Sequence, residues 1–193
     1  MKLYFAPGAC SLAPHIAACE LGMKLTLVGA DFGPELAEVN PKGLVPALEL
    51  NDGQVLTEVP AILMYLADQQ ADAGLVPPPG DFQRYRTLEW LAFISSELHK
   101  GYGNPKHSDE TGAVIVRRLE ARFGLIEAAL VRQDSGWLMA DFSIADIYLY
   151  TVSRWLPLLG LDINTWPALA ALCSRVAARP ATCAALQAEG LEE

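Results

Sequence analysis

The chain has 193 residues, of which 52% are hydrophobic and 19% are charged; this composition is typical of a folded globular protein and excludes a disordered one. The formal net charge is −9, and this excess of negative charge disfavours nucleic acid or an anionic membrane as a partner. No apolar run approaches the roughly 20 residues that a membrane-spanning helix needs, and the first residues lack the pattern of a signal peptide.

The first third of the chain alternates between strand patterns and helix patterns. Short strands are predicted at 2–5, 24–29, 45–50 and 54–58, and helices at 11–22 and 61–72. Asn51-Asp52-Gly53 lies between the last two strands and is typical of a hairpin turn. The stretch from Asp31 to Asn40 is interpreted as a short helix or a loop. This order predicts a small α/β layer built on a mixed sheet.

A proline-rich break follows at residues 74–81. Its three consecutive prolines cannot continue a helix and favour an extended spacer, so this stretch is predicted to link two domains. Beyond it the chain has helical spacing throughout, with helices predicted at 82–101, 112–133, 143–160, 166–180 and 181–190. The predicted domains are an α/β domain over 1–74, a linker over 75–81 and an all-helical domain over 82–193.

One helix start is marked more sharply than the others. Ser143-Ile144-Ala145-Asp146 has the spacing of a capping box, with an acid in the first turn where the helix dipole favours it. We interpret this motif as part of the folding of the helix and not as a binding site.

The four cysteines are Cys10, Cys19, Cys173 and Cys183. They form no Cys-x-x-Cys pair, have no zinc-ligand spacing and are too few for a disulfide scaffold, so the sequence favours a reducing cytoplasm. Cys10 directly precedes the first predicted helix. It is either a small buried apolar residue or a thiol activated by the helix start, where unsatisfied N–H groups and the dipole contribute roughly 0.3–1 kcal/mol. The other three are interpreted as packing residues.

Six motifs occur in order along nearly the whole chain. They are KLYFAPGACSLAPHIA (2–17), NPKGLVPALEL (40–50), LTEVPAILMYLAD (56–68), EWLAFISSELHKG (89–101), FSIADIYLY (142–150) and the segment 178–191. Together they resemble the cytosolic glutathione transferases, and within these the bacterial beta class. The resemblance implies an α/β plus all-α fold: a thioredoxin-like N-terminal domain, an all-helical C-terminal domain and an active site between them.

The resemblance also implies a function. It indicates a cytoplasmic, homodimeric detoxification enzyme that joins reduced glutathione to small electrophilic apolar compounds, or reduces peroxides or disulfides with it. Glutathione is then a co-substrate, and no metal or other cofactor is implied. The alternative is a non-catalytic binding protein that is similar to the glutathione transferases.

Family members suggest which residues act. The cysteine matching Cys10 contacts the glutathione sulfur and forms a mixed disulfide with it, and a His-Lys pair matching His99 and Lys100 faces the same cleft. The resemblance therefore assigns catalysis to Cys10 and His99. It assigns glutathione binding to Cys10, Val45, Pro46, Glu58, Val59, Glu97, His99 and Lys100.

Three of these assignments carry a specific geometry. The Val45-Pro46 bond is expected to be cis, so that the Val45 backbone pairs with the extended tripeptide as an added strand. Glu58 is expected to pair with the ammonium group of glutathione at the start of a helix. In a dimer, Glu97 is expected to reach the glutathione of the partner subunit.

Three features depart from the beta-class pattern. Val59-Pro60 stands where the relatives have a small residue after the glutamate, and Ala92 stands where they commonly have asparagine. The segment 31–40 is shorter, and no residue clearly matches the basic contact to the glycyl carboxylate. These departures predict weaker glutathione binding than in a typical member.

Three aromatic residues, Trp90, Phe93 and Tyr102, lie in or next to the helix that carries His99. For Trp90 and Phe93 a place in the core is the simpler interpretation. Tyr102 follows Gly101 and is interpreted as a candidate lining of an apolar second-substrate pocket.

Overall fold

The structure is a computed structural model that describes residues 1–102 and 110–191. The chain forms two compact units. The first unit contains residues 1–78 together with 177–193, and the second contains residues 79–176.

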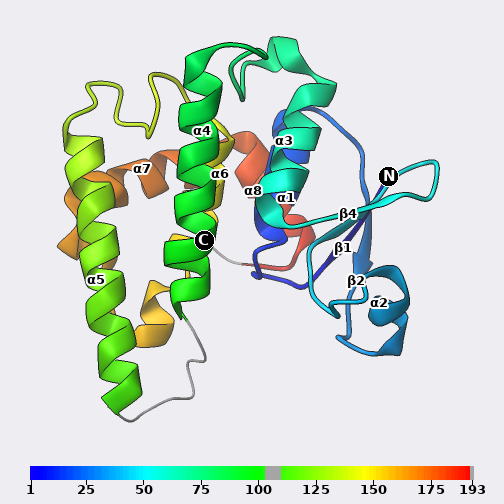
Figure 1. Ribbon diagram of the computed structural model, residues 1–193, viewed down its shortest axis with the longest axis horizontal. Helices are drawn as coiled ribbons and strands as arrows, with labels where there is room; N and C mark the ends of the chain where they lie inside the picture. Colours follow the sequence, from blue (N-terminus) through cyan, green and yellow to red (C-terminus); the bar gives the residue numbers. More distant parts are fainter. Residues whose placement is uncertain (103–109, 192–193) are drawn as a thin grey trace. The chain divides into compact units, whose positions relative to one another are not determined.

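The first unit is built on a four-stranded sheet with the strand order β2-β1-β3-β4; β1, β2 and β4 are labelled in Figure 1. The strands are β1 (Lys2–Phe5), β2 (Thr26–Gly29), β3 (Ala47–Glu49) and β4 (Val55–Thr57). β1 pairs in parallel with β2 and antiparallel with β3, which places Leu3 opposite both Leu27 and Leu48. The predicted mixed sheet is therefore confirmed, with its central strands in the core.

Three helices complete this part of the first unit. α1 (Leu12–Glu20) and α3 (Val59–Gln69) pack against each other and bury the side chains of Ile16 and Ile62 fully. The stretch 31–40 forms the short helix α2 (Pro34–Val39), and a 3-10 turn (Ala71–Ala73) follows α3. This arrangement is the thioredoxin-like domain that the resemblance implies.

The C-terminal helix α8 (Pro180–Ala188) also belongs to the first unit, because it packs along α1 (Figure 1). Arg179 at its start forms two hydrogen bonds with the carboxylate of Glu20. The helical domain predicted over 82–193 therefore ends earlier, at residue 176. Helical spacing showed that this last helix has an apolar face, but not which helix covers that face.

The residue after α8 ties the C-terminal segment to the turn before α1. The Glu189 carboxylate accepts a hydrogen bond from the Gly8 N–H at 3.0 Å and lies 2.9 Å from Nδ1 of His15. Both His15 and Glu189 are 6% exposed. The two side chains form an ion pair only when the His15 imidazole is protonated.

We expect the His15–Glu189 pair to make folding stability depend on pH. Burial lowers the pKa of His15. Hydrogen bonds to Cys19 and Glu189, together with their charges, outweigh this effect and raise the pKa to about 9. Because the folded state holds this proton more tightly than the unfolded chain, the stabilisation is complete below about pH 6.5 and is lost as the pH rises through about 9. In chemical unfolding between about pH 6 and pH 10, Glu189→Gln should flatten this loss. A variant that follows the wild-type pH curve would contradict the assignment.

The second unit is helical. It contains α4 (Phe82–Phe93), α5 (Glu110–Val131), α6 (Ile144–Ser153) and most of α7 (Pro167–Ala177). α4 and α6 pack against each other, and every residue of α6 is buried, as its apolar sequence predicts. The helix predicted over 143–160 ends at Ser153, because Pro157 would remove the next hydrogen bond and clash with the Ser153 carbonyl. Two 3-10 turns, Leu156–Leu159 and Ile163–Thr165, lead into α7.

The capping box at the start of α6 is confirmed. Asp146 is fully buried and accepts hydrogen bonds from the Ser143 N–H at 2.9 Å and from the Ser143 hydroxyl at 3.0 Å. Its other oxygen accepts the Leu138 N–H at 2.8 Å. Burial raises the pKa of Asp146 to about 6, although these hydrogen bonds lower it. One side chain therefore holds both the helix start and the loop before it.

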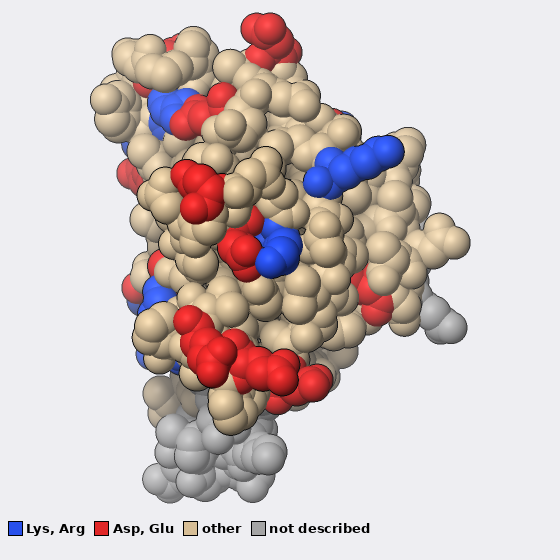
Figure 2. All heavy atoms as spheres, turned by 90° about the vertical axis from the view of Figure 1, so that its right-hand side faces the viewer, with Lys and Arg blue, Asp and Glu red and all other residues tan. Residues whose placement is uncertain are grey.

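The distribution of charged side chains on the surface agrees with the negative net charge of the chain. Figure 2 shows acidic side chains gathered along the lower edge of one face, while the basic side chains there are scattered.

Among the helices that the structure describes, none has the length and apolar character needed to cross a membrane.

Candidate functional site

Cys10 lies in the turn between β1 and α1 and is buried, with 8% of the residue exposed. Its thiol donates a hydrogen bond to the Val45 carbonyl, with an S···O distance of 3.4 Å. The neighbouring Ser11 hydroxyl closes the turn, since it accepts the Ala6 N–H and donates to the Ala6 carbonyl, both at 3.2 Å. The turn around Cys10 and the segment at Val45 are thus held together.

The start of α1 differs from what the sequence suggested. The Leu12 N–H donates to the Ala9 carbonyl at 3.0 Å, the Ala13 N–H donates to the Cys10 carbonyl at 3.2 Å, and Pro14 has no N–H. The first-turn amides are therefore already engaged and are not directed at the thiol. The dipole of α1 remains as a source of positive potential at Cys10.

The other cysteines have different environments. All four lie in the described part of the chain, and none of them forms a disulfide. Burial raises the pKa of Cys173 to about 12, against the opposing effects of Ser153 and Arg154, so this thiol is inert at neutral pH. Cys183 is exposed, and its interpretation as a packing residue is therefore wrong. It provides an accessible reference thiol.

The peptide bond between Val45 and Pro46 is cis, as the resemblance implied. Val45 is half-buried and Pro46 is buried. The residues that follow, Ala47 and Leu48, are fully buried in β3 and anchor this segment in the sheet.

Glu58 is the residue before α3, and its φ of 71° lies in the left-handed region that residues other than glycine rarely adopt. Such strained residues cluster at binding sites. Its side chain is 61% exposed and forms an ion pair with Lys42, at 2.6 Å between Nζ and Oε1. Lys42 also donates to the Thr57 hydroxyl at 2.7 Å. The next residue, Val59, is 3% exposed and begins the helix.

Sequence reasoning did not single out Lys42. The structure places this ammonium group beside the residue that was assigned to the γ-glutamyl end of glutathione. The available signal was its position, since Lys42 is the one basic residue of the 40–50 motif.

Glu97, His99 and Lys100 lie in the second unit, where the helix changes its winding. α4 continues after Phe93 as a π-helix (Ile94–His99) and then as a 3-10 turn (Lys100–Tyr102), so the single helix predicted over 82–101 is not regular. π-helical turns frequently occur at functional sites. Glu97 forms an ion pair with Arg122, at 2.7 Å between Oε2 and Nε, and Lys100 is exposed.

His99 is half-buried among aromatic side chains. Its Nδ1 lies 2.7 Å from the hydroxyl of Tyr148, and its ring centroid lies 5.2 Å from that of Trp155. The Tyr148 ring meets the imidazole edge-on, which fixes the ring plane. Sequence reasoning missed Tyr148 and Trp155, because their distance from His99 along the chain gives no sign of the contact.

Tyr102 is a core residue and does not line a pocket. It is 6% exposed, its hydroxyl donates to the Val152 carbonyl at 2.8 Å, and its ring packs edge-on against Trp155. Burial raises the pKa of its phenol far above the ordinary value. Its interpretation as part of the second-substrate pocket is therefore wrong.

The two units thus offer two sets of chemical groups. The first has a thiol bonded to a backbone carbonyl, and an exposed carboxylate paired with an ammonium group. The second has an imidazole oriented by a phenol. Within the described residues, no group of three or more His, Cys, Asp or Glu side chains is arranged to hold a metal ion. These groups suit thiol chemistry and hydrogen bonding to a sulfur atom.

Comparison with known proteins identifies the family. The model for the glutathione S-transferase N-terminal domain matches residues 9–69, and the model for the C-terminal domain matches residues 90–180. Glutathione S-transferase GstA of Escherichia coli O157:H7 is 42% identical over 203 residues, and the match covers the whole of both chains. The chain belongs to the glutathione S-transferase family.

Solved structures of this family narrow the class. A sphingomonad glutathione S-transferase complexed with glutathione is 43% identical and superposes with a TM-score of 0.93, with both chains covered completely. The beta-class glutathione S-transferase of Sphingomonas chungbukensis is 42% identical, with the same TM-score and the same coverage. The resemblance to the bacterial beta class is therefore confirmed.

Proposed function

We propose that this glutathione transferase joins reduced glutathione to small electrophilic apolar compounds. The observation that carries the proposal is the similarity over the whole chain to a transferase complexed with glutathione, at a TM-score of 0.93. The local geometry supports it: Cys10, Val45 and Glu58 occupy one unit, on the turn before α1, the entry to β3 and the start of α3. On this basis we also assign the protein to detoxification in the reducing cytoplasm.

The first unit would hold the tripeptide by its backbone and by its charged end. The Val45 backbone would pair with the extended chain of glutathione as an added strand. The Glu58 carboxylate would accept the ammonium group, and the Val59 N–H at the start of α3 would bind the γ-glutamyl carboxylate. Pro60 provides no N–H, so one donor fewer is available at this helix start.

In the second unit, His99 has the chemistry to act on a sulfur atom. If the Tyr148 hydroxyl donates to Nδ1, the neutral imidazole carries its proton on Nε2 and can donate a hydrogen bond to a thiolate or hold a polarised water. In this role Tyr148 is a positioning residue, because it selects the tautomer without touching the substrate.

We expect Tyr148→Phe to lower kcat about three- to tenfold, with the KM for glutathione nearly unchanged, because the phenol–imidazole hydrogen bond is lost but no ligand contact is. Steady-state kinetics across a pH range would measure both parameters and the pH profile. Tyr150→Phe is the matched control on the same helix, because the Tyr150 hydroxyl accepts from Arg154, whereas the Tyr148 hydroxyl is the one 2.7 Å from Nδ1 of His99. Equal kcat values in both variants would contradict the positioning role.

The proposed activity is tested by retention on immobilised glutathione, followed by conjugation of an aryl halide. Retention with turnover supports an enzyme, whereas neither would favour the non-catalytic binding protein. Cys10→Ala should keep part of the conjugating activity, because glutathione itself supplies the attacking sulfur. Full activity in Cys10→Ala, together with loss in His99→Ala, would assign the chief catalytic role to the histidine.

Cys10 supports disulfide exchange as a second candidate function. The Cys10 thiolate would attack one sulfur of a disulfide, form a mixed disulfide and release the other half as a thiolate. Reduced glutathione, as its thiolate, would then attack the substrate sulfur of this mixed disulfide, form a glutathione–substrate disulfide and release Cys10 as a thiolate. Reduction of a small disulfide that is lost in Cys10→Ala, but kept in Cys183→Ala, would support this activity.

The proposal includes a homodimer. Phe82 and Tyr85 are 64% and 59% exposed and lie three residues apart on α4, so one face of this helix presents apolar surface that a second copy would cover. Glu97 would then leave its ion pair with Arg122 and contact the glutathione bound to the partner subunit. Light scattering at micromolar concentration that gives the mass of a monomer would contradict the dimer.

A further inference from the structure

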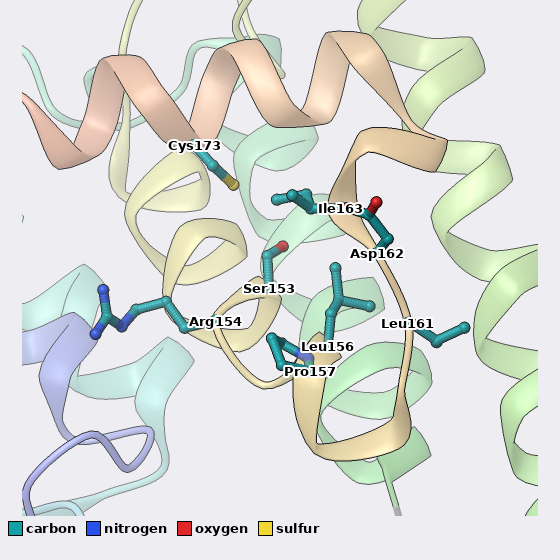
Figure 3. A pocket seen from close by; sticks show the side chains of 8 residues that line it. All are labelled: Ser153, Arg154, Leu156, Pro157, Leu161, Asp162, Ile163 and Cys173. Atoms are coloured by element: carbon teal, nitrogen blue, oxygen red, sulfur yellow. The ribbon is translucent and has the colours of Figure 1, made fainter.

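A cavity of about 220 Å³ lies entirely within the helical unit, between the end of α6, the two 3-10 turns that follow it and α7 (Figure 3). No part of the proposed transferase chemistry uses it. Its lining residues are Ser153, Arg154, Leu156, Pro157, Leu161, Asp162, Ile163 and Cys173.

The interior of the cavity is mostly apolar. In Figure 3 the side chains of Ser153, Leu156, Ile163 and Cys173 point toward one another, whereas Arg154 extends away from them. The Arg154 guanidinium donates to the Tyr150 hydroxyl at 3.0 Å. The Asp162 carboxylate accepts the Asn164 N–H at 2.9 Å. Both charged groups thus have polar partners outside the cavity, so its interior favours a neutral occupant.

Ser153 supplies the polar feature that points to a ligand. The residue is 2% exposed, and within the described residues its hydroxyl makes no hydrogen bond of ordinary geometry; its polar neighbour is the Cys173 thiol, whose pKa it lowers. The neighbouring hydroxyl of Thr151, on the same helix, donates to the Ile147 carbonyl at 2.9 Å. Buried hydroxyls normally find an oxygen or nitrogen partner in this way, and one that faces a cavity with a weakly bonding thiol beside it marks a place for an external hydrogen-bonding group.

The opposite wall of the cavity offers Ser153 only a weak hydrogen-bonding partner, the Cys173 thiol, which a ligand hydroxyl would replace. The Cys173 thiol remains protonated at neutral pH, because burial raises its pKa to about 12. It therefore offers a polarisable surface and a weak donor, not a nucleophile. Binding in this cavity is expected to be reversible and non-covalent.

This cavity is distinct from the surroundings of His99. Tyr148 and Trp155 are seven residues apart, so they lie on nearly the same face of the helical path and both contact the imidazole. Ser153 is five residues after Tyr148 and therefore lies about 140° further around that path. One face therefore contacts His99, and the other lines the cavity.

We propose that this cavity binds a small neutral alcohol of the phenol type. Its hydroxyl would bond to Ser153, and its ring would lie against Leu156 and Ile163. The size is suitable, because a cavity of about 150 Å³ already accommodates benzene, and the larger volume here leaves room for a hydroxyl and a small substituent. The inference does not depend on the proposed conjugation, since every residue involved lies in the helical unit.

The test is a calorimetric titration of the full-length protein with phenol and, in parallel, with toluene. Wild-type protein should bind phenol more tightly than toluene. Ser153→Ala should weaken phenol about five- to tenfold and leave toluene unchanged, because only the hydrogen bond is lost. Thr182→Val is the matched control, since it removes the other buried hydroxyl that makes no ordinary hydrogen bond within the described residues, on α8 in the first unit, and it should leave both affinities unchanged.

Two further measurements locate the bound molecule. Ile163→Trp should fill the cavity and abolish binding of both probes, while the unfolding transition shows that the variant is folded. A crystal soaked with 4-bromophenol should show the bromine between α6 and α7. Binding of neither probe to the wild type, equal loss of phenol in Ser153→Ala and Thr182→Val, or bromine at another position would each overturn the proposal.

Discussion

Replacing Asp146 with alanine is expected to lower the free energy of unfolding by about 3–5 kcal/mol, because it leaves several buried donors without an acceptor. The carboxylate accepts the N–H groups of Leu138 and Ser143 and the Ser143 hydroxyl, and the residue is fully buried. Each unsatisfied buried donor costs about 1–3 kcal/mol, and the lower half of that range, applied to two amides and a hydroxyl, gives the expected loss. The loss acts on α6, every residue of which is buried in the helical unit.

Denaturant titration of the wild type and the variant measures this effect. Asp81→Ala is the matched control, since Asp81 also caps a helix and accepts the Gln83 N–H at 2.8 Å, but at an exposed position. Water can replace that acceptor, so the control should lose only about 1 kcal/mol. Similar losses in the two variants would show that Asp146 acts as an ordinary cap.

Incubation with oxidised glutathione at neutral pH is expected to place one glutathionyl group on Cys10, at least about tenfold faster than on Cys183. Exposure alone predicts the opposite order, because Cys10 is 8% exposed and Cys183 lies at the surface. The selectivity must therefore come from binding: glutathione held along the Val45 backbone would bring its sulfur to the thiol. The hydrogen bond from Cys10 to the Val45 carbonyl has to open, since the attacking species is the thiolate.

Peptide mass spectrometry locates the adduct, and a second disulfide provides the control. A small neutral disulfide without the peptide frame, such as 2-hydroxyethyl disulfide, should prefer the exposed Cys183. The glutathione adduct should be absent in Cys10→Ala. If Cys183 reacts first with both reagents, Cys10 is a buried packing residue and not an activated thiol.

The local features of the fold were predictable from sequence because neighbouring residues determine them. Asn51-Asp52-Gly53 predicts the turn between β3 and β4, where the Leu50 N–H bonds to the Gln54 carbonyl at 2.8 Å and Gly53 has a φ of 84°. The capping box of α6 depends on four consecutive residues. The apolar pattern predicted a helix that extends beyond the observed end of α6 at Ser153, and Pro157 is the local signal for that end.

Features that depend on distant partners were not predictable in this way. α8 has the same helical pattern as α7, yet it packs on α1, and no local signal distinguishes the two. The change to a π-helix after Phe93 was likewise not predictable, because the apolar residues in this stretch have a spacing that also fits a regular α-helix. The cis bond at Pro46 was expected only from the resemblance, because most bonds before proline are trans.

The residues of the candidate site show the same difference between local and distant features. Cys10, Glu58 and His99 were identified through motifs, which record residue types at fixed positions. Lys42 and Tyr148 were missed, because each acts through a side chain 16 or 49 residues away that a motif does not connect to it. The first turn of α1 shows the same limit, since its amides are engaged by the carbonyls of Ala9 and Cys10.

The central claim is that glutathione binds to the first unit with its ammonium group at Glu58, and titration calorimetry with reduced glutathione tests it most directly. We expect one saturable site per chain with a dissociation constant above about 10 µM, because Val59-Pro60 removes polar contacts. Glu58→Gln should weaken binding about tenfold or more, as the loss of a charge-assisted pair predicts. Glu49→Gln, which alters the exposed pair with Lys2 in the same sheet, should not. No saturable binding at millimolar glutathione, or equal effects of the two substitutions, would contradict the account.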